Sequence, residues 1–127
     1  MPRRDAKSAI PGLTHLRVTF SDDFYLGPGR ADLMALIAET GSIAAAGKRM
    51  GMSYKRAWSL VQALNDGFGA PLVEASRGGA GQGGAMLTEA GAELLRRYRH
   101  MQAATRSAIA ADVVAIAAML PDMSGKK

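Results

Sequence analysis

The sequence predicts a mainly α-helical α+β fold with two small β-hairpins and a long C-terminal helix. Apolar and polar residues alternate in a short N-terminal stretch, and apolar residues recur every three or four positions in several later segments. Glycine, serine or threonine stands at the boundaries between these segments. With 127 residues, the chain has the length of one ordinary domain with one hydrophobic core.

The first hairpin is predicted within residues 13–26. Leu16, Val18 and Phe20 alternate with polar residues over 13–20, which is the period of a half-buried strand. After a polar turn, residues 24–26 return as a short second strand, and a Gly-Pro-Gly sequence ends it.

Two helices are predicted next, over residues 30–40 and 43–50. Gly41 is a typical residue for the C-terminal end of the first helix, and Ser42 is a typical N-cap for the second. Three alanines at 44–46 give the second helix a thin surface that another helix can approach closely.

A third helix is predicted over residues 54–68, after a break at Gly51 and an N-cap at Ser53. Its apolar residues fall on one stripe, formed by Ala57, Leu60, Val61, Leu64 and Phe68. The opposite side is polar, with Lys55, Ser59, Gln62 and Asp66, and with Arg56 at its edge.

A second hairpin and a long helix complete the chain. Residues 72–74 and 85–87 are predicted strands around a glycine-rich loop, and Thr88 caps a helix of about 50 Å that meets no proline before Pro121. A single small domain cannot cover so long an apolar stripe, so we expect the distal part to pair with a second copy. The residues expected at this dimer contact are Leu94, Tyr98, Met101, Ile109, Val113, Ile116 and Leu120.

The predicted organisation is a disordered basic arm (1–12), a folded domain (13–87), a long dimerisation helix (88–121) and a solvated tail (122–127). The arm has no apolar segment of signal-peptide length, and the apolar stretch 113–120 is far shorter than the roughly 20 residues of a membrane span. We therefore expect a soluble, cytoplasmic, nucleoid-associated protein with no membrane partner.

The composition favours a polyanionic partner and argues against catalysis by metals or thiols. Lys and Arg number 16 against 11 Asp and Glu, a formal charge of +5, which favours nucleic acid or an anionic membrane surface. The absence of cysteine excludes a disulfide framework, a cysteine nucleophile and a thiolate zinc site, and only His15 and His100 are imidazoles. We expect no metal site and no cofactor.

Residues 41–58 have the pattern of a helix-turn-helix: a short first helix with small residues, a glycine turn between two methionines, and a capped second helix. We expect Lys55, Arg56 and Ser59 to read base edges in double-stranded DNA, with Ser53, Tyr54 and Gln62 beside them. The residues expected mainly on phosphates are Ser42, Lys48, Arg49, Arg77 and Gln82. The alternative is an ordinary helical hairpin with a solvated basic surface.

The loop 77–84 contains a G-x-G-x-x-G string at Gly79, Gly81 and Gly84. A dinucleotide site requires that string to open a helix, whereas a strand is predicted after it. We interpret the loop as the wing of a winged helix, which approaches a sugar-phosphate backbone; the alternative is a mobile hairpin tip with no ligand.

Other polar and aromatic groups are explained by structure. We expect the cluster Arg96, Arg97, Arg99 and His100 to be a solvated helix face, with phosphate contact as the alternative. Trp58 and Tyr98 are expected in the core rather than as a stacking platform, and Glu89 and Glu93 are expected as surface charges. No residue is a catalytic candidate, so we expect that the protein is not an enzyme.

The chain resembles the N-terminal winged helix-turn-helix domain of the ModE family of molybdenum-responsive regulators, which is related to LysR-type winged helices. The resemblance covers roughly residues 13 to 105 and rests on residues 24–30, 39–46, 51–58, 71–74, 78–85 and 87–88. It implies a dimer joined through the long helix, the helix after Ser53 in the major groove, and the wing on the DNA backbone. Family members carry C-terminal molybdate-binding modules, whereas this chain stops after its long helix, so no small-molecule effector is expected to act on it directly.

The expected function is that of a dimeric, sequence-specific transcriptional regulator that binds a roughly palindromic DNA site. Three alternatives remain: a winged-helix protein–protein interaction module, an oxyanion (molybdate)-responsive regulator acting through a partner, and an enzyme that uses an oxyanion or nucleotide.

Overall fold

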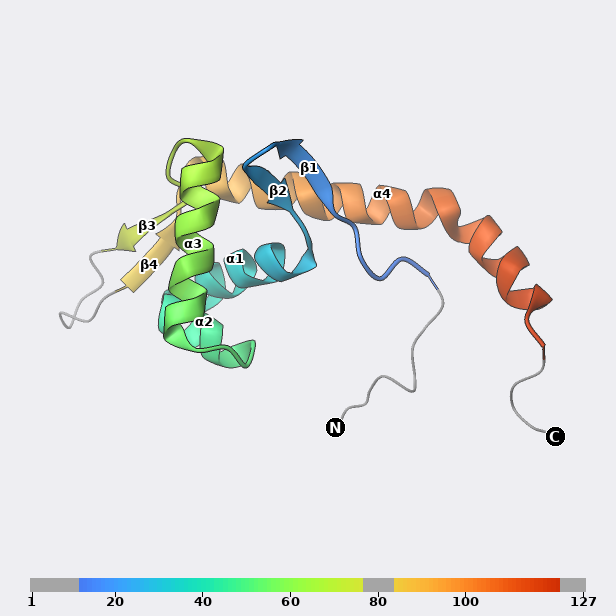
Figure 1. Ribbon diagram of the computed structural model, residues 1–127, viewed down its shortest axis with the longest axis horizontal. Coiled ribbons are helices and arrows are strands. Elements are labelled where there is room, and N and C mark those ends of the chain that lie inside the picture. Colours follow the sequence, from blue (N-terminus) through green and yellow to red (C-terminus); the bar gives the residue numbers. More distant parts are fainter. Residues whose placement is uncertain (1–11, 77–83, 122–127) are drawn as a thin grey trace. The chain divides into compact units, whose positions relative to one another are not determined.

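The computed structural model describes residues 12–76 and 84–121, and the chain divides into two compact units. The larger unit, His15–His100, contains both hairpins, the first three helices and the start of the last helix. The described part of the other unit comprises residues 12–14 and 101–121. The elements, labelled in Figure 1, are β1 (Val18–Ser21), β2 (Phe24–Leu26), α1 (Pro28–Thr40), α2 (Ile43–Arg49), α3 (Tyr54–Phe68), β3 (Val73–Ser76), β4 (Gly84–Leu87) and α4 (Glu89–Met119). This mainly helical arrangement with two hairpins confirms the predicted winged helix-turn-helix fold class.

The first hairpin is antiparallel, with Val18 opposite Leu26. Phe24 and Leu26 of β2 are buried, as expected of a strand packed on a core. The prediction for the preceding strand is wrong in two respects: β1 begins only at Val18, and the Phe20 side chain is 53% exposed. The hydrogen-bonded ladder is shorter than the segment in which residue types alternate, because β2 is only three residues long and offers no further partners.

Helix α1 starts at Pro28, earlier than predicted, because proline has the backbone angle of a first helical residue and needs no donor there. The helix ends as predicted at Gly41, whose φ of 73° lies in the left-handed region that glycine adopts readily. Asp32 of α1 forms an ion pair with Arg99 of α4 at 2.9 Å.

Helices α2 and α3 approach each other most closely at Gly47. A Cβ atom at Gly47 would lie 2.8 Å from the Cβ of Ala57, closer than two carbon atoms can pack. Ala46 and Gly47 are buried, whereas Ala44 is exposed, so the thin surface of α2 is displaced from the predicted run of alanines. Core residues from all three helices and both wing strands surround this crossing: Leu33, Ile37, Ala46, Ala57, Val61, Val73 and Ala85.

The second hairpin, which we call the wing, pairs β3 with β4 in an antiparallel register with Val73 opposite Leu87. Its strands cover residues 73–76 and 84–87, slightly displaced from the predicted strands. The backbone N–H of Ala85 donates a hydrogen bond of 2.9 Å to the carbonyl of Gly41, which ties the wing to the α1–α2 turn.

Helix α4 begins as predicted, with the Thr88 hydroxyl accepting a hydrogen bond of 3.0 Å from the N–H of Gly91. Tyr98 is 0% exposed, and its hydroxyl donates a hydrogen bond of 2.6 Å to the carbonyl of Leu16. The expectation that Tyr98 packs in the core is confirmed. Its assignment to a dimer contact is wrong, because its own chain already covers the whole side chain.

The remaining part of α4, from Met101 onward, exposes large apolar side chains at Val114, Ile116 and Met119, and Leu120 just beyond the helix is exposed as well. Among the described residues, no helix has both the length and the apolar character that a membrane span requires.

We predict that Tyr98→Phe lowers the free energy of unfolding by about 0.5–1.5 kcal/mol at neutral pH, because the Leu16 carbonyl loses its donor. Burial, reinforced by Asp32 and opposed by Arg99, raises the pKa of Tyr98 above its ordinary value of about 10. The unfolded chain therefore releases this proton first, so the contribution of Tyr98 to stability is constant below a pH of about 10 and falls as pH rises toward the native pKa.

Urea unfolding of wild type and variant between neutral and alkaline pH measures both effects. The Tyr98→Phe variant is expected to lose part of the alkaline decline, whereas Tyr54→Phe, at an exposed position, retains it. An unchanged decline in Tyr98→Phe would show that another group causes it.

Candidate nucleic-acid interface

The start of α3 presents a polar surface that is fixed from below by the core. Ala57, Val61 and Leu64 are buried on one side of the helix. On the other side, all six candidate residues of the segment are exposed: Ser53, Tyr54, Lys55, Arg56, Ser59 and Gln62. The predicted division of α3 into a core side and an outward side is thus confirmed.

The Ser53 cap holds the first turn of α3 in place. Its hydroxyl accepts a hydrogen bond of 3.1 Å from the backbone N–H of Arg56, and the turn before it contains Gly51 with φ of 73°. No carboxylate among the described residues pairs with Lys55 or Arg56. Both cations therefore remain available to an anionic partner.

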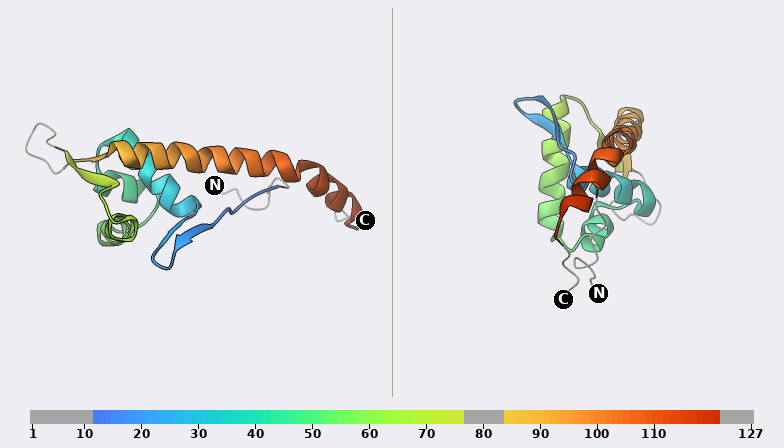
Figure 2. Two further views of the ribbon diagram at one scale, coloured as in Figure 1. Left: turned by 90° about the horizontal axis from the view of Figure 1, so that it is seen from above. Right: turned by 90° about the vertical axis from the view of Figure 1, so that its right-hand side faces the viewer.

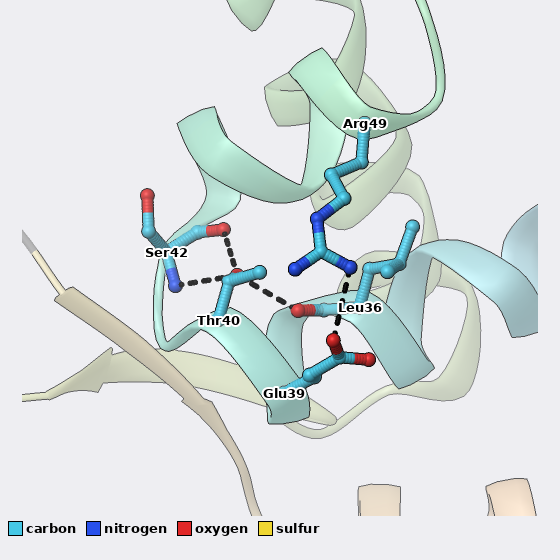
Figure 3. A network of polar contacts seen from close by, with 5 residues as sticks. All are labelled: Leu36, Glu39, Thr40, Ser42 and Arg49. Atoms are coloured by element: carbon cyan, nitrogen blue, oxygen red, sulfur yellow. Dashed lines mark hydrogen bonds and ion pairs between the residues drawn. The ribbon is translucent and has the colours of Figure 1, made fainter.

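The turn between α1 and α2 is held by a polar network that the sequence did not reveal (Figure 3). The hydroxyl of Thr40 lies 2.7 Å from the carbonyl oxygen of Leu36 and accepts the N–H of Ser42 at 3.2 Å. The Ser42 hydroxyl accepts the N–H of Ala45 at 3.0 Å and so caps α2 as predicted.

Two further phosphate candidates lie on α2 and differ in their surroundings. Lys48 is exposed, whereas Arg49 donates a hydrogen bond of 2.9 Å to Glu39 of α1 (Figure 3). The charge of Arg49 is partly neutralised by this exposed ion pair, so it offers less to a phosphate than its sequence position suggests. Arg77 and Gln82, the candidates in the wing loop, lie outside the described residues.

Aromatic side chains border a hollow of about 280 Å³ between α3 and the wing. Tyr54 and Trp58 line it from α3, and Val73 and Ala85 line it from the wing. Trp58 is 42% exposed, so its predicted place in the core is wrong. Ala57 and Val61 occupy the core side of the helix, and Trp58 lies at the edge, next to the exposed Lys55 side.

Asn65 attaches the wing to α3, a role that sequence reasoning missed. Its Nδ2 donates to the carbonyl of Val73 at 2.9 Å, and its Oδ1 accepts the N–H groups of Leu72 and Val73 at 2.8 and 3.1 Å. The only signal in the sequence is one amide next to the apolar stripe of α3. These bonds set the position of the wing beside the exposed start of the helix.

The last glycine of the glycine-rich string, Gly84, begins β4. A strand therefore follows the string, whereas a dinucleotide site needs a helix start there to receive the pyrophosphate. Gly79 and Gly81 lie outside the described residues. This agrees with the predicted wing.

Three arginines near the start of α4 form ion pairs. Arg96 and Arg97 both contact Glu93, the latter at 2.7 Å, and Arg99 contacts Asp32. These contacts fit the expected solvated face and explain Glu93 without a catalytic role. Within residues 12–76 and 84–121, no group of three His, Asp or Glu side chains is placed to hold a metal ion.

Comparison with known proteins identifies the family to which this helix-turn-helix domain belongs. Residues 31–92 match the family described as bacterial regulatory helix-turn-helix protein, lysR family. Over 68% of the chain, the fold is similar to a crystal structure of the CbnR_DBD–DNA complex, with a TM-score of 0.54 and 31% identity, and 95% of that chain is covered.

Longer relatives match through part of their length. The chain is 47% identical over 78 residues to the molybdenum-pterin-binding protein MopB of Rhodobacter capsulatus, covering 61% of this chain and 29% of MopB. It is 37% identical over 83 residues to the DNA-binding transcriptional dual regulator ModE of Escherichia coli (strain K12), covering 65% of this chain and 32% of ModE. The chain thus spans under a third of the length of these relatives.

Proposed function

We propose that this chain, which carries a helix-turn-helix DNA-binding domain of the lysR family related to the N-terminal region of ModE, is a dimeric, sequence-specific transcriptional regulator. A regulatory helix-turn-helix domain is non-enzymatic, in agreement with the expectation that the protein is not an enzyme. The observation that carries the proposal is the pair of exposed cations Lys55 and Arg56 on a helix whose other side is buried. We place its activity on the nucleoid in the cytoplasm.

In the proposed complex, α3 enters the major groove. Lys55, Arg56 and Ser59 contact base edges, because their side chains are exposed on the start of this helix. The residues beside them are Ser53, Tyr54 and Gln62. Lys48 and the Ser42 end of α2 contact phosphates and fix the orientation of α3. Arg77 and Gln82 belong to the same phosphate-binding set on the wing side.

The proposed dimer forms through the distal half of α4. Ile116 is exposed there, as is Leu120 just beyond the end of the helix. Val113 lines an apolar hollow of about 380 Å³ together with Val114 and Ala117. Burying such a stripe against the same stripe of a second copy removes apolar surface from water. Leu94, Met101 and Ile109 extend the stripe toward the start of the helix. A two-fold dimer would read two half-sites about 34–36 Å apart.

The DNA contact is tested with a preferred duplex selected from a randomised pool. We expect Lys55→Ala to weaken binding to the preferred duplex by about 1–3 kcal/mol and to random DNA much less, because base contacts carry the specificity. Lys48→Ala is the matched control on α2: it should weaken both complexes about equally and reduce the slope of log K against log salt by about 0.9 for each phosphate that is no longer neutralised. Fluorescence anisotropy at several salt concentrations gives both quantities.

A wild-type chain that binds DNA weakly and with no salt dependence would contradict the proposal and favour a protein-binding module. If Lys55→Ala lost equal affinity for the preferred duplex and for random DNA, Lys55 would contact the DNA backbone and not a base edge.

The dimer is tested by sedimentation equilibrium. We expect twice the chain mass for wild type and a single chain mass for Ile116→Asp, because a carboxylate in the paired stripe is desolvated without a partner. Ala111→Asp, at an exposed position on the other side of the same helix, should leave the dimer intact. A monomeric wild type, or a dimer that survives Ile116→Asp, would contradict pairing through this stripe.

A further inference from the structure

A second hollow, of about 240 Å³, borders α3 on the side away from the wing. It is lined where β2 passes into α1 and by the first two turns of α3, through Arg56 and Leu60. The wing hollow is instead lined by Tyr54 and Trp58. The two hairpins accordingly lie on either side of α3 in the views of Figures 1 and 2.

Positive charge gathers at this hollow, which we call the arginine hollow. His15, Arg17, Arg30 and Arg56 are among its lining residues, and within the described chain no Asp or Glu lines it. The guanidinium carbons of Arg17 and Arg30 lie 3.7 and 3.9 Å from the centre of the Tyr25 ring. The ring thus holds two like charges near each other, an arrangement that an anion stabilises and that water alone only screens.

Hydrogen-bond donors at the arginine hollow are left without protein acceptors. Arg30 donates from Nη1 to the carbonyl of Tyr25 at 3.3 Å, whereas its Nε is buried and has no partner among the described residues. No carboxylate in residues 12–76 and 84–121 pairs with Arg17, Arg30 or Arg56. Planar guanidinium donors of this kind match the oxygens of a phosphate group.

The start of α1 adds a second, independent anion-attracting feature. The hollow is also lined by Gly27, Pro28 and Gly29, and the N-cap Gly27 provides no side-chain acceptor for the first turn. The N–H groups of that turn and the helix dipole favour negative charge. At Gly29, a Cβ atom would meet nothing within 4 Å, so the backbone is open to an approaching group.

We infer that the arginine hollow binds a phosphate group and that, in the DNA complex, it takes one phosphodiester beside the groove entered by α3. The second part rests on the proposed function, because Arg56 borders both the hollow and the outward side of α3. The first hairpin would thereby contact one DNA strand on the side of α3 opposite the wing.

The test asks whether Arg17 contacts one particular phosphate of the DNA. Arg17→Gln removes a charge at an exposed position, Arg17→Lys retains it, and Arg97→Gln removes a charge from α4 outside the hollow. Each variant is titrated against duplexes in which single phosphates are replaced by uncharged methylphosphonates. At one phosphate position in each half-site, the methylphosphonate should lower the affinity of wild type, Arg17→Lys and Arg97→Gln on the order of tenfold. At the same position it should not lower the affinity of Arg17→Gln any further.

A DNA-free arm separates the two sources of phosphate and keeps the hollow testable if the proposed function fails. Calorimetric titration of each full chain with inorganic phosphate should show weak binding that Arg17→Gln abolishes and Arg97→Gln retains. If this binding is present but no methylphosphonate position couples to Arg17, the site takes a free anion and the DNA part of the inference is overturned. If neither the effect of the methylphosphonates nor the binding of inorganic phosphate depends on Arg17, the arginine hollow is not a phosphate site. The proposed function stands in that case if wild type binds DNA with a steep salt dependence.

Discussion

The close approach of α2 to α3 is the constraint on which the rest of this structure depends. Gly47 faces Ala57 at a distance that leaves no room for a methyl group on α2. The two helices therefore cross at one fixed point, and the glycine turn at Gly51 joins them over the shortest path. Because Ala57 is on the buried side of α3, this crossing also determines which side of the helix faces outward.

Polar contacts then fix the elements around α3, which are the wing, the α1–α2 turn and the start of α4. Asn65 holds the wing through three hydrogen bonds, and the Ala85 N–H ties the same wing to Gly41 at the α1–α2 turn. Tyr98 links the start of α4 to the segment before β1 through the Leu16 carbonyl. The cations at the start of α3 are thus presented from a surface whose supports are all internal to one compact unit. Such preorganisation lowers the entropy lost when a rigid duplex is bound.

Features that depend on local chemistry could be predicted from the sequence, and features that depend on distant partners could not. Ser42, Ser53 and Thr88 all cap helices as expected, because a cap needs only a hydroxyl and the next turn of backbone. Periodicity also identified the outward side of α3. It failed at Tyr98 and Trp58, which have similar positions beside apolar stripes but opposite burial. The segment before β1 lies against Tyr98 at Leu16, and nothing comparable among the described residues covers Trp58. The arginine hollow joins residues from β2, α1, α3 and the segment before β1, a grouping that no single segment reveals.

The central claim, that the α2–α3 crossing orients the DNA-binding side of α3, is tested most directly by Gly47→Ala. Alanine favours a helix over glycine by about 1 kcal/mol, so any loss must come from the forced separation of the helices. The measurement is affinity for the preferred duplex well below each variant's melting temperature, with Ala103→Ser, at an exposed position of α4, as the control. We predict weaker DNA binding and a lower melting temperature for Gly47→Ala alone. Wild-type affinity and stability in Gly47→Ala would contradict the account.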